Sequence, residues 1–233
     1  MLRSFLLLAA LIGLSACQTV SAPPSPQPTA PNTPRLSSQQ AIANFREVVA
    51  RVEPVAEQTC RAETPNQNCD FIIAVDDDPA SGINAFQTLR GGQPYIVFTV
   101  GLIADVRNQD ELAFVMGHEA AHHIARHIPQ QQASAQSGAL IFGVLATLSG
   151  ANQAAAESAA QIGATVGARR FSQDHELEAD ALGSVIACRA GYNSLRGSEY
   201  FTRLPDPGDR FLGTHPPNAA RIETVRQMAA RGC

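Results

Sequence analysis

Lysine and tryptophan are absent from the 233 residues of this chain, and aromatic residues make up only 6% of it. All 17 basic side chains are therefore arginine. A phosphate-binding P-loop, a pyridoxal Schiff base and a protein kinase active site each depend on a lysine. The sequence excludes these three classes of enzyme.

An excess of positive charge is also missing. The formal net charge is −4 and the pI is near 5.8. Nucleic-acid-binding domains are usually basic, so we expect no nucleic-acid partner. Hydrophobic residues nevertheless account for 45% of the sequence, which is enough for a packed core. The length suits one domain with appendages.

The start of the chain reads as a targeting segment and a tether rather than as part of the fold. Residues 1–16 contain a basic region, a short apolar run and a small-residue cleavage site, which predict a signal peptide. The pattern LSAC that ends at Cys17 resembles the lipobox of bacterial lipoproteins, whose cysteine is acylated. The alternative is an ordinary secretory signal with an incidental cysteine. Residues 17–35 would then be the lipidated cysteine and a proline-rich tether.

The residue after the lipobox cysteine predicts the compartment. In bacterial lipoproteins, Gln18 in place of aspartate implies transfer to the outer membrane. We therefore expect residues 36–233 to form a domain that faces the periplasm and is held to the membrane through the lipid on Cys17.

Four further cysteines predict disulfides, because an even number in an oxidising compartment normally pairs. They are Cys60, Cys69, Cys188 and Cys233. Three pairings are possible. The most economical joins Cys60 to Cys69 and Cys188 to Cys233. A zinc site built from cysteines is disfavoured, because no CxxC spacing occurs.

Hydrophobic patterns predict a mainly helical α+β fold with a small antiparallel sheet. Three apolar segments, residues 70–75, 83–89 and 94–100, read as strands. Two adjacent glycines between the last two segments predict a hairpin turn. Pro94 has no N–H group, so we expect it at the start of a strand or at a sheet edge.

Helices are expected in most of the remaining chain. Ser37 or Ser38 can cap the first helix, in which Pro54 would cause a kink or an end. The apolar positions of this helix are Ile42, Phe45, Val49 and Val52. Residues 171–190 and 219–231 predict two later helices, and Gly191 would stop the first of these.

Residues 131–168 are rich in alanine, glycine, serine and glutamine. The apolar part, residues 139–148, is too short for a transmembrane helix. We expect a helical hairpin that packs through small residues, or a cover over a cleft. Contact with a membrane surface is a third interpretation.

The pattern HExxH is formed by His118, Glu119 and His122, on a helix expected to begin at Asp110. Residues four apart lie on one helical face, so both imidazoles can bind one metal ion with Glu119 beside them. A metal lowers the pKa of water, and a nearby carboxylate can accept the proton. The alternative is a chance pattern on a solvated helix, which the apolar residues before it disfavour. The residues of this helix that we expect to face the core are Leu112, Val115, Met116 and Ala120.

A third ligand must come from elsewhere. The metzincin pattern requires glycine and histidine where this chain has Ala125 and Ile128. Glu176 and Asp180 lie four apart on a later helix, so Glu176 can complete the site while Asp180 accepts a hydrogen bond from a ligand imidazole. Taken alone, this segment would be an acidic surface helix. Glu178 is expected to be solvated.

These motifs together resemble the HtpX and CAAX-prenyl-protease family of zinc metallopeptidases, which are gluzincins with HExxH on one helix and ExxxD on a later one. The resemblance covers about residues 40–233, and it is strongest to the soluble periplasmic branch of outer-membrane lipoproteins. Further short motifs that carry it lie at residues 84–86, 91–92, 101–102, 122–127, 172–180, 214–216 and 221–222.

The resemblance implies a zincin-like domain with one zinc ion per chain and Glu119 as general base. The implied ligands are His118, His122 and Glu176. His215, in a His-Pro motif, is implied either to occupy the fourth zinc position and inhibit, or to stabilise the tetrahedral intermediate. Arg221 is a candidate for binding a carboxylate or an oxyanion. The histidines expected to be structural or exposed are His123, His127 and His175.

The implied function is a zinc endopeptidase of the periplasm that acts in protein quality control. Its substrates would be unfolded or misassembled envelope proteins, and the outer-membrane barrel assembly machinery is a candidate partner. The strand at residues 94–100 would be the edge that binds an extended peptide beside the active-site cleft. One alternative is a chaperone-like or binding lipoprotein with a latent metal site. Another is a purely structural lipoprotein.

Overall fold

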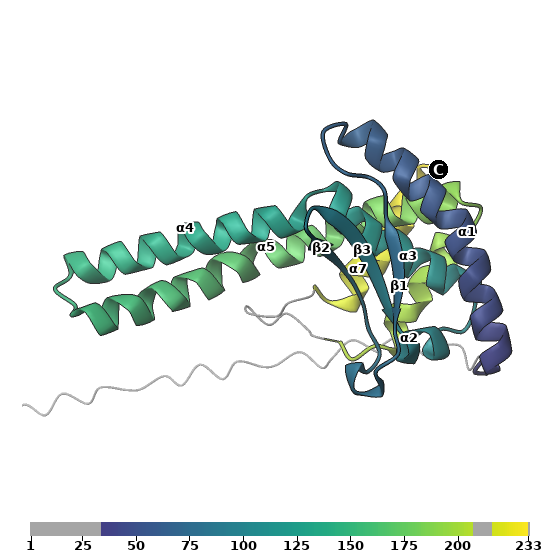
Figure 1. Cartoon of the computed structure of the whole chain (residues 1–233), viewed down its shortest axis with the longest axis horizontal. Helices are drawn as coiled ribbons and strands as arrows, with labels where there is room; N and C mark the ends of the chain where they lie inside the picture. Colours follow the sequence, from purple (N-terminus) through teal and green to yellow (C-terminus); the bar gives the residue numbers. More distant parts are fainter. Residues whose placement is uncertain (1–33, 207–215, 233) are drawn as a thin grey trace, which may run out of the picture.

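The structure, a computed structural model, describes residues 34–206 and 216–232, and the side chains of residues 169–172 lie outside this description. The elements in chain order are α1 (Ser38–Glu63), β1 (Ile72–Asp76), η1 (Pro79–Ser81), β2 (Ala85–Arg90), β3 (Gln93–Thr99), α2 (Val100–Asp105), α3 (Gln109–Ile124), α4 (His127–Leu148), α5 (Gln153–Arg189), α6 (Ser194–Ser198), η2 (Glu199–Arg203) and α7 (Asn218–Ala230). Figure 1 shows a helical body with one small sheet, from which α4 and α5 project. The expected α+β class is confirmed.

Helix α1 begins as the sequence predicts, because Ser37 caps it through a capping box. The Ser37 hydroxyl accepts a hydrogen bond from the backbone N–H of Gln40 at 3.3 Å, and the Gln40 side chain accepts one from the Ser37 N–H at 3.1 Å. Of the expected apolar positions, Val52 is buried but Ile42 is 50% exposed. The buried face is instead formed by Ala41, Val48, Val52, Ala56, Thr59 and Cys60.

Pro54 does not end α1, so that one of the two predicted alternatives is wrong. The helix continues through it to Glu63. Pro54 lacks the N–H that the carbonyl of Ala50 would accept, but both residues are exposed, so water can satisfy that carbonyl. On the opposite side, Val52 and Ala56 remain fully buried and hold the helix against the core.

The sheet is mixed rather than antiparallel, which corrects the prediction. Its strand order is β1-β3-β2, with β1 parallel and β2 antiparallel to β3. The strand at residues 94–100 is therefore central, and β2 is one of the two edges. Ile96 and Phe98 of β3 are fully buried, because strands lie on both sides of it and helices cover its inner face.

Pro94 is compatible with a central strand because of where the parallel ladder begins. The first paired residue of β3 on the β1 side is Tyr95, opposite Ile72. The missing N–H of Pro94 therefore precedes the ladder and leaves no acceptor of β1 unpaired. The expected hairpin turn is confirmed, since Gly91 and Gly92 adopt φ values of 58° and 84° between β2 and β3.

Helix α3 is buried on nearly all sides and forms the centre of the body. The inward candidates from the sequence are all buried. Asn108 caps its first turn by accepting from the Glu111 N–H at 3.0 Å. Glu111 is itself buried and receives two hydrogen bonds, of 2.7 and 2.6 Å, from the guanidinium of Arg203. The charge of this acidic first turn is thus paired inside the protein.

A glycine contact sets the distance between α3 and α5. A Cβ at Gly117 would lie 2.5 Å from the carbonyl oxygen of Gly183, and a Cβ at Gly183 would lie 2.6 Å from the backbone nitrogen of His118. Only two glycines allow the helix backbones to approach so closely. Ala179, one helical turn before Gly183 on α5, is also fully buried.

The segment at residues 131–168 forms the helical hairpin that was one of the expectations. Figure 1 shows α4 and α5 side by side, extending away from the body. A Cβ at Gly138 would lie 2.1 Å from the carbonyl oxygen of Gly163 across the hairpin. Within the described part of the chain, no helix has the length and apolar character required to cross a bilayer.

The helices at the C-terminal side differ from the predictions in length. Helix α5 begins at Gln153, well before residue 171, because alanine-rich sequence continues the same helix from the hairpin into the body. It ends at Arg189, and Gly191 follows with φ 90°, as expected. Helix α7 spans Asn218–Ala230, within one residue of the prediction.

Candidate metal centre

Two helices bring three ligand side chains to one point. His118 and His122 project from α3 one turn apart, and Glu176 projects from α5. The Nε2 atoms of the two histidines lie 3.0 Å apart. The Glu176 carboxylate lies 3.5 Å from His118 Nε2 and 3.4 Å from His122 Nε2. All three ligand atoms lie within 4.8 Å of one another.

These separations fit a single tetrahedral metal ion. Zinc binds histidine nitrogen and carboxylate oxygen at roughly 2.0–2.1 Å, so two ligands of a tetrahedral ion lie about 3.3 Å apart. Two imidazoles and one carboxylate are also the donor set of many catalytic zinc sites, where the fourth position is open. The residues present therefore fit such an ion.

Asp180, one helical turn after Glu176, orients the first histidine. Its carboxylate is fully buried and accepts a hydrogen bond from His118 Nδ1 at 2.9 Å. A histidine that donates through Nδ1 presents its Nε2 lone pair, and Nε2 is the atom that faces the other two ligands. The structure thus brings together the four residues that the sequence paired by helical spacing.

Arg221 of α7 also binds the Asp180 carboxylate. Its Nε and Nη2 atoms donate hydrogen bonds of 2.7 Å each to the two carboxylate oxygens. The guanidinium carbon lies 3.9 Å from the centre of the Phe201 ring, and Nη2 is 3.4 Å from Glu176. Arg221 therefore neutralises part of the acidic charge at the centre and fixes Asp180.

The centre carries an excess of buried negative charge that favours a cation. Glu119, Glu176 and Asp180 are all buried, and Arg221 is the arginine that lies among them. Burial lowers the pKa of His118, but hydrogen bonds to Asp180 and Glu176 outweigh this effect and raise the pKa to about 10. The same field that stabilises a proton here also attracts a metal cation.

Glu119 lies between the ligands and the edge strand β2. Burial raises the pKa of its carboxyl group, against the positive charges of His118 and His122, which lower it. The backbone N–H of Gln87, in β2, also donates a hydrogen bond to Glu119 and lowers its pKa. The net direction is upward, which makes the carboxylate a stronger base than an exposed glutamate.

The comparison with known families decides the class of this centre. Peptidase family M48 matches residues 43–229, which is most of the chain. The chain belongs to peptidase family M48. A search of curated proteins finds no match. M48 members are metal-dependent peptidases, and the group formed by His118, His122 and Glu176 is where this M48 domain can hold its metal ion.

The edge strand of the M48 domain runs along the metal centre between two cavities. The first, of about 230 Å³, is bounded by Ala85, His118 and Glu119, and its apolar wall is formed by Phe114, Val115, Tyr200, Phe201 and Leu204. The second, of about 240 Å³, is bounded by Gln87, Leu89 and His122. No described residue from 131–168 lines either cavity.

Among the described residues, no strand pairs with the outer edge of β2, so a further strand could be added there. The carbonyl oxygen of Asn84 accepts a hydrogen bond from Thr99 of β3, so backbone groups at even positions face the sheet. The groups of Ala85, Gln87 and Leu89 therefore face outward, and the Gln87 N–H reaches Glu119. The edge that faces the cleft is thus β2, whereas the sequence prediction assigned this role to residues 94–100.

A second group of polar side chains lies behind His122. His127 and His175 are buried, and their rings stack with centroids 4.2 Å apart. His122 Nδ1 lies 2.8 Å from His127 Nδ1, and His127 Nε2 lies 3.2 Å from Glu178 Oε2. The side chain of Glu178 is 61% exposed, as expected, but it has a defined partner.

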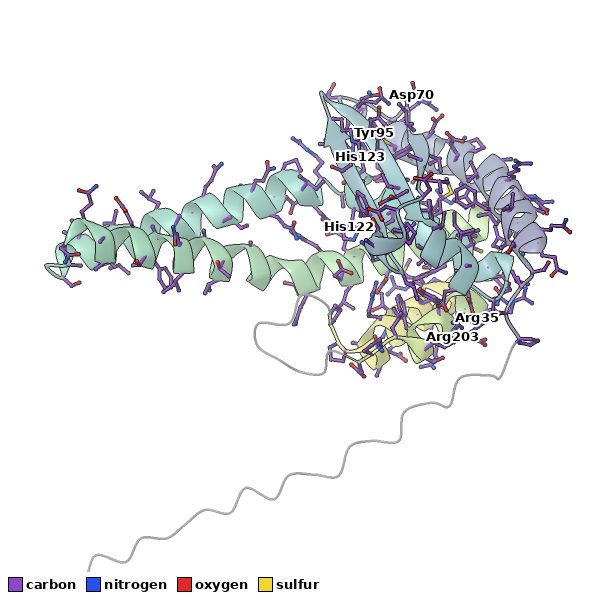
Figure 2. All side chains as sticks on the ribbon, turned by 60° about the horizontal axis from the view of Figure 1, so that its bottom comes forward. Arg35, Asp70, Tyr95, His122, His123 and Arg203 are labelled. Atoms are coloured by element: carbon purple, nitrogen blue, oxygen red, sulfur yellow. A yellow bond between two sulfur atoms is a disulfide. The ribbon has the colours of Figure 1, made fainter. Side chains whose placement is uncertain are left out.

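His123 has a structural role, as predicted. Its Nε2 lies 2.7 Å from the carbonyl oxygen of Asn68, and the Gln67 side chain donates to the His123 carbonyl oxygen at 2.6 Å. Figure 2 shows His122 and His123 where the hairpin joins the body. The loop that contains Gln67 and Asn68 is closed by the predicted disulfide between Cys60 and Cys69, whose Cα atoms are 5.6 Å apart.

Several predicted residues lie outside the described part of the chain. These are Cys17, His215 and Cys233. The acylation of Cys17, the two alternative roles of His215, and the pairing of Cys188 with Cys233 stay predictions. The signal peptide and most of the tether lie in the same undescribed region.

Sequence reasoning missed the Gln87 backbone contact with Glu119, the Phe201 contact with Arg221 and the His127 contact with His122. A backbone donor carries no sequence signal. Phe201 lies far from Arg221 along the chain. His122 and His127 are five residues apart across a helix boundary, so the rule for residues on one helical face could not pair them.

Proposed function

We propose that this M48 domain is a zinc-dependent endopeptidase of the gluzincin type. Zinc would be held by His118, His122 and Glu176, one ion per chain, with Glu119 as general base. The observation that carries the proposal is the convergence of these three ligand atoms within 4.8 Å, beside a buried glutamate that faces an open strand edge.

The bound ion supplies a Lewis acid that polarises the peptide carbonyl and lowers the pKa of water. Glu119 accepts a proton from the attacking water and then delivers it to the leaving amine. Its raised pKa suits this exchange, because the base must release the proton again in the second half of the reaction. Asp180 and Arg221 hold the ring of His118 in place throughout.

The open edge of β2 is the site where we propose that substrate binds as an added strand. The outward backbone groups of Ala85 and Leu89 pair with any extended peptide, because strand addition reads the backbone rather than the side chains. Folded proteins rarely present such a strand. This geometry supports unfolded or misassembled proteins as the substrate class, and the apolar wall of the first cavity suits the apolar side chains that such proteins expose.

The periplasmic face of the outer membrane is the proposed location, with the lipid on Cys17 as anchor. The lipobox pattern and Gln18 support it. The disulfide between Cys60 and Cys69 also supports it, because such bonds persist in oxidising compartments. Envelope proteins would then be the substrates, and the outer-membrane barrel assembly machinery is a candidate partner.

Replacement of Glu119 by glutamine tests the mechanism. Glutamine keeps the shape but cannot accept the proton, so we expect cleavage of an unfolded protein to fall by roughly 10²–10⁴-fold while zinc stays bound. Zinc content by elemental analysis and peptide release are measured on the same sample. The matched control is Glu157→Gln, which changes an exposed carboxylate on the hairpin and should cleave normally.

Two outcomes would redirect the proposal. Undiminished cleavage by the Glu119→Gln variant would refute the general-base role. If the unaltered protein binds unfolded chains and zinc but cleaves none, a chaperone-like lipoprotein with a latent site is the better description. His215→Ala belongs in the same assay: a rise in turnover identifies an inhibitory histidine, and a fall identifies one that serves the transition state.

A further inference from the structure

His127 lies against His122 on the side away from the other two ligands. It is the first residue of α4, and its side chain is 2% exposed. The turn before it passes through Arg126, at φ 59° and ψ 37°, the one non-glycine residue with positive φ in the described part of the chain. A left-handed backbone is unfavourable for a residue with a Cβ, so the contacts of the buried histidine help to hold this turn.

The imidazole of His127 connects a ligand to a carboxylate. Its Nδ1 lies 2.8 Å from His122 Nδ1, and its Nε2 lies 3.2 Å from Glu178 Oε2. One face of the ring stacks on His175, with an angle of 9° between the planes. The partners of His127 come from two other helices, since His122 belongs to α3 whereas His175 and Glu178 belong to α5.

The ring nitrogens of His122 and His127 that carry protons can be assigned from the requirement that His122 binds a metal ion. His122 Nε2 faces the other ligands, so it must present a lone pair to a metal ion. The proton of the neutral ring is then on Nδ1, and this N–H donates to His127 Nδ1. Because His127 Nδ1 accepts, the proton of its own ring is on Nε2, which donates to the Glu178 carboxylate. A single assignment satisfies both hydrogen bonds.

His118 is likewise connected to a carboxylate through its Nδ1 atom, but no imidazole stands between the two. Its Nδ1 contacts the Asp180 carboxylate directly, at 2.9 Å. Partners of this kind fix the tautomer and the ring orientation of a metal ligand, and their loss commonly weakens metal binding. For His122 the corresponding carboxylate is Glu178, and an imidazole stands between them.

We propose that His127 is a positioning residue for His122, fixing the tautomer and ring orientation that bind the metal, and that Glu178 fixes His127 in turn. This inference rests on the proposed metal site. It assigns a defined role to two side chains that the helical-face pattern leaves unexplained.

Three variants of the full chain separate hydrogen bonding from packing. His127→Phe keeps a ring in the stack on His175 but removes both nitrogens. His127→Asn places a carbonyl oxygen close to the position of Nδ1, where it can accept from His122. Glu178→Gln keeps an acceptor but removes the charge, and Glu157→Gln, an exposed position on the same helix, is its matched control.

Zinc affinity is measured by competition with a chromogenic chelator, and the coordination of Co²⁺ by its visible absorption spectrum. We expect His127→Phe to bind zinc about 10-fold to 100-fold more weakly and to alter the Co²⁺ spectrum. His127→Asn should stay within about threefold of the unaltered protein, because it restores the acceptor. Glu178→Gln should lose a smaller factor, and Glu157→Gln none.

Three results would overturn the inference. The first is His127→Phe with unchanged zinc affinity and Co²⁺ spectrum. The second is an equal loss in the Phe and Asn variants, which would mean that the ring acts through packing. The third is equal zinc affinity of Glu178→Gln and Glu157→Gln, which would mean that Glu178 does not act on His122 through His127. If circular dichroism shows that His127→Phe does not fold, the His127→Asn and Glu178→Gln variants decide the question. Failure of the unaltered protein to bind zinc would refute the proposed metal site itself.

Discussion

At the scale of single residues, the centre depends on charges that are buried and paired. Asp180 has no exposed surface, and its two partners, His118 and Arg221, are also buried. Removal of one member of such a group leaves an uncompensated charge inside the protein, which costs more than the pair contributes to stability. The Asp180 carboxylate therefore serves stability and ligand orientation together.

Asp180→Asn should lower both the stability and the metal affinity. The amide keeps the shape but removes the carboxylate that accepts two hydrogen bonds from the Arg221 guanidinium, so we expect the free energy of unfolding to fall by about 3 kcal/mol. Zinc affinity should fall by roughly 10-fold to 100-fold, because a neutral amide is a weaker and less well-oriented acceptor for the Nδ1 proton of His118 than the carboxylate. Urea unfolding and chelator competition measure the two effects.

A surface ion pair provides the control for this variant. Arg51 and Glu47 form an exposed pair of 3.1 Å on α1. Arg51→Gln should change the free energy of unfolding by less than about 1 kcal/mol. If Asp180→Asn and Arg51→Gln lowered the free energy of unfolding equally, burial would not make the ion pairs of Asp180 more costly to break than a surface pair.

The site residues that the sequence placed together are those whose spacing puts them on one face of a helix. Spacings of four placed His118 with His122, and Glu176 with Asp180, on single faces. The partners from other elements could not be found in this way. Arg221 comes from α7 and was expected to bind a carboxylate or an oxyanion; it binds a carboxylate, but the sequence could not identify it as that of Asp180. The contact between His122 and His127 arises from a turn with positive φ.

At the scale of elements, the close approach of α3 and α5 brings the ligands together. Gly117 and Gly183 meet at this crossing, one residue before His118. A side chain here would push the helices apart and move Glu176 away from the histidines. The distance between ligands is therefore set by two residues that have no side chain.

Gly117→Ala should destabilise the protein and weaken zinc binding. The added Cβ would lie 2.5 Å from a backbone carbonyl oxygen, which cannot rotate away. We expect the free energy of unfolding to fall by about 1–3 kcal/mol, as for other overpacked sites. Urea unfolding and chelator competition again provide the measurements.

The matched substitution is Gly143→Ala in the hairpin. Its Cβ would lie 3.3 Å from the side-chain methyl of Ala160, a tight contact that a shift of a few tenths of an ångström relieves. Both changes give the same gain in helix propensity. We expect Gly143→Ala to change the free energy of unfolding by less than about 1 kcal/mol and to leave zinc affinity unchanged. Similar losses in both variants would contradict the importance of the α3–α5 crossing.

The hairpin of α4 and α5 shows how far composition predicts an element. Its richness in small residues predicted close helix packing, and Gly138 and Gly163 provide it. The large apolar residues lie outward instead, with Leu145 and Leu148 exposed by 60% and 79%. Composition could not distinguish a projecting hairpin from a cover over the cleft. The direction in which α4 and α5 extend is set by the turn between α3 and α4.

At the scale of the whole molecule, a disulfide joins the end of α1 to the loop before β1, and this loop contacts the end of α3. Cys60 and Cys69 close the loop whose residues Gln67 and Asn68 hold His123, the neighbour of a ligand. The bond therefore restricts a loop that packs against the metal centre from outside the ligand set.

Replacement of both Cys60 and Cys69 by serine should destabilise the fold without removing the centre. Closure of a loop of this length contributes about 2–3 kcal/mol by restricting the unfolded chain. We expect a fall of this size in the free energy of unfolding, measured by urea, and zinc binding that persists under native conditions. Loss of zinc from the folded variant would show that the loop is required to hold α3.

The absence of lysine provides a test of the predicted anchor. If Cys17 is acylated at its amine, the mature chain has no primary amine, because all its basic side chains are arginine. An amine-reactive label should leave the native lipoprotein unmodified and should react once with a form that lacks the lipid. Intact-mass measurement distinguishes the two, and labelling of the native lipoprotein would contradict acylation of the amine.

The sequence by itself determined the chemistry, because HExxH and ExxxD place their side chains by the geometry of a single helix. It also predicted the α+β class and the hairpin turn, and it favoured the pairing of Cys60 with Cys69 among three possibilities. Only the tertiary structure decided which strand forms the edge beside Glu119, how close α3 and α5 approach, and what lies behind each ligand. These features depend on contacts between segments far apart in the chain, where local periodicity carries no information.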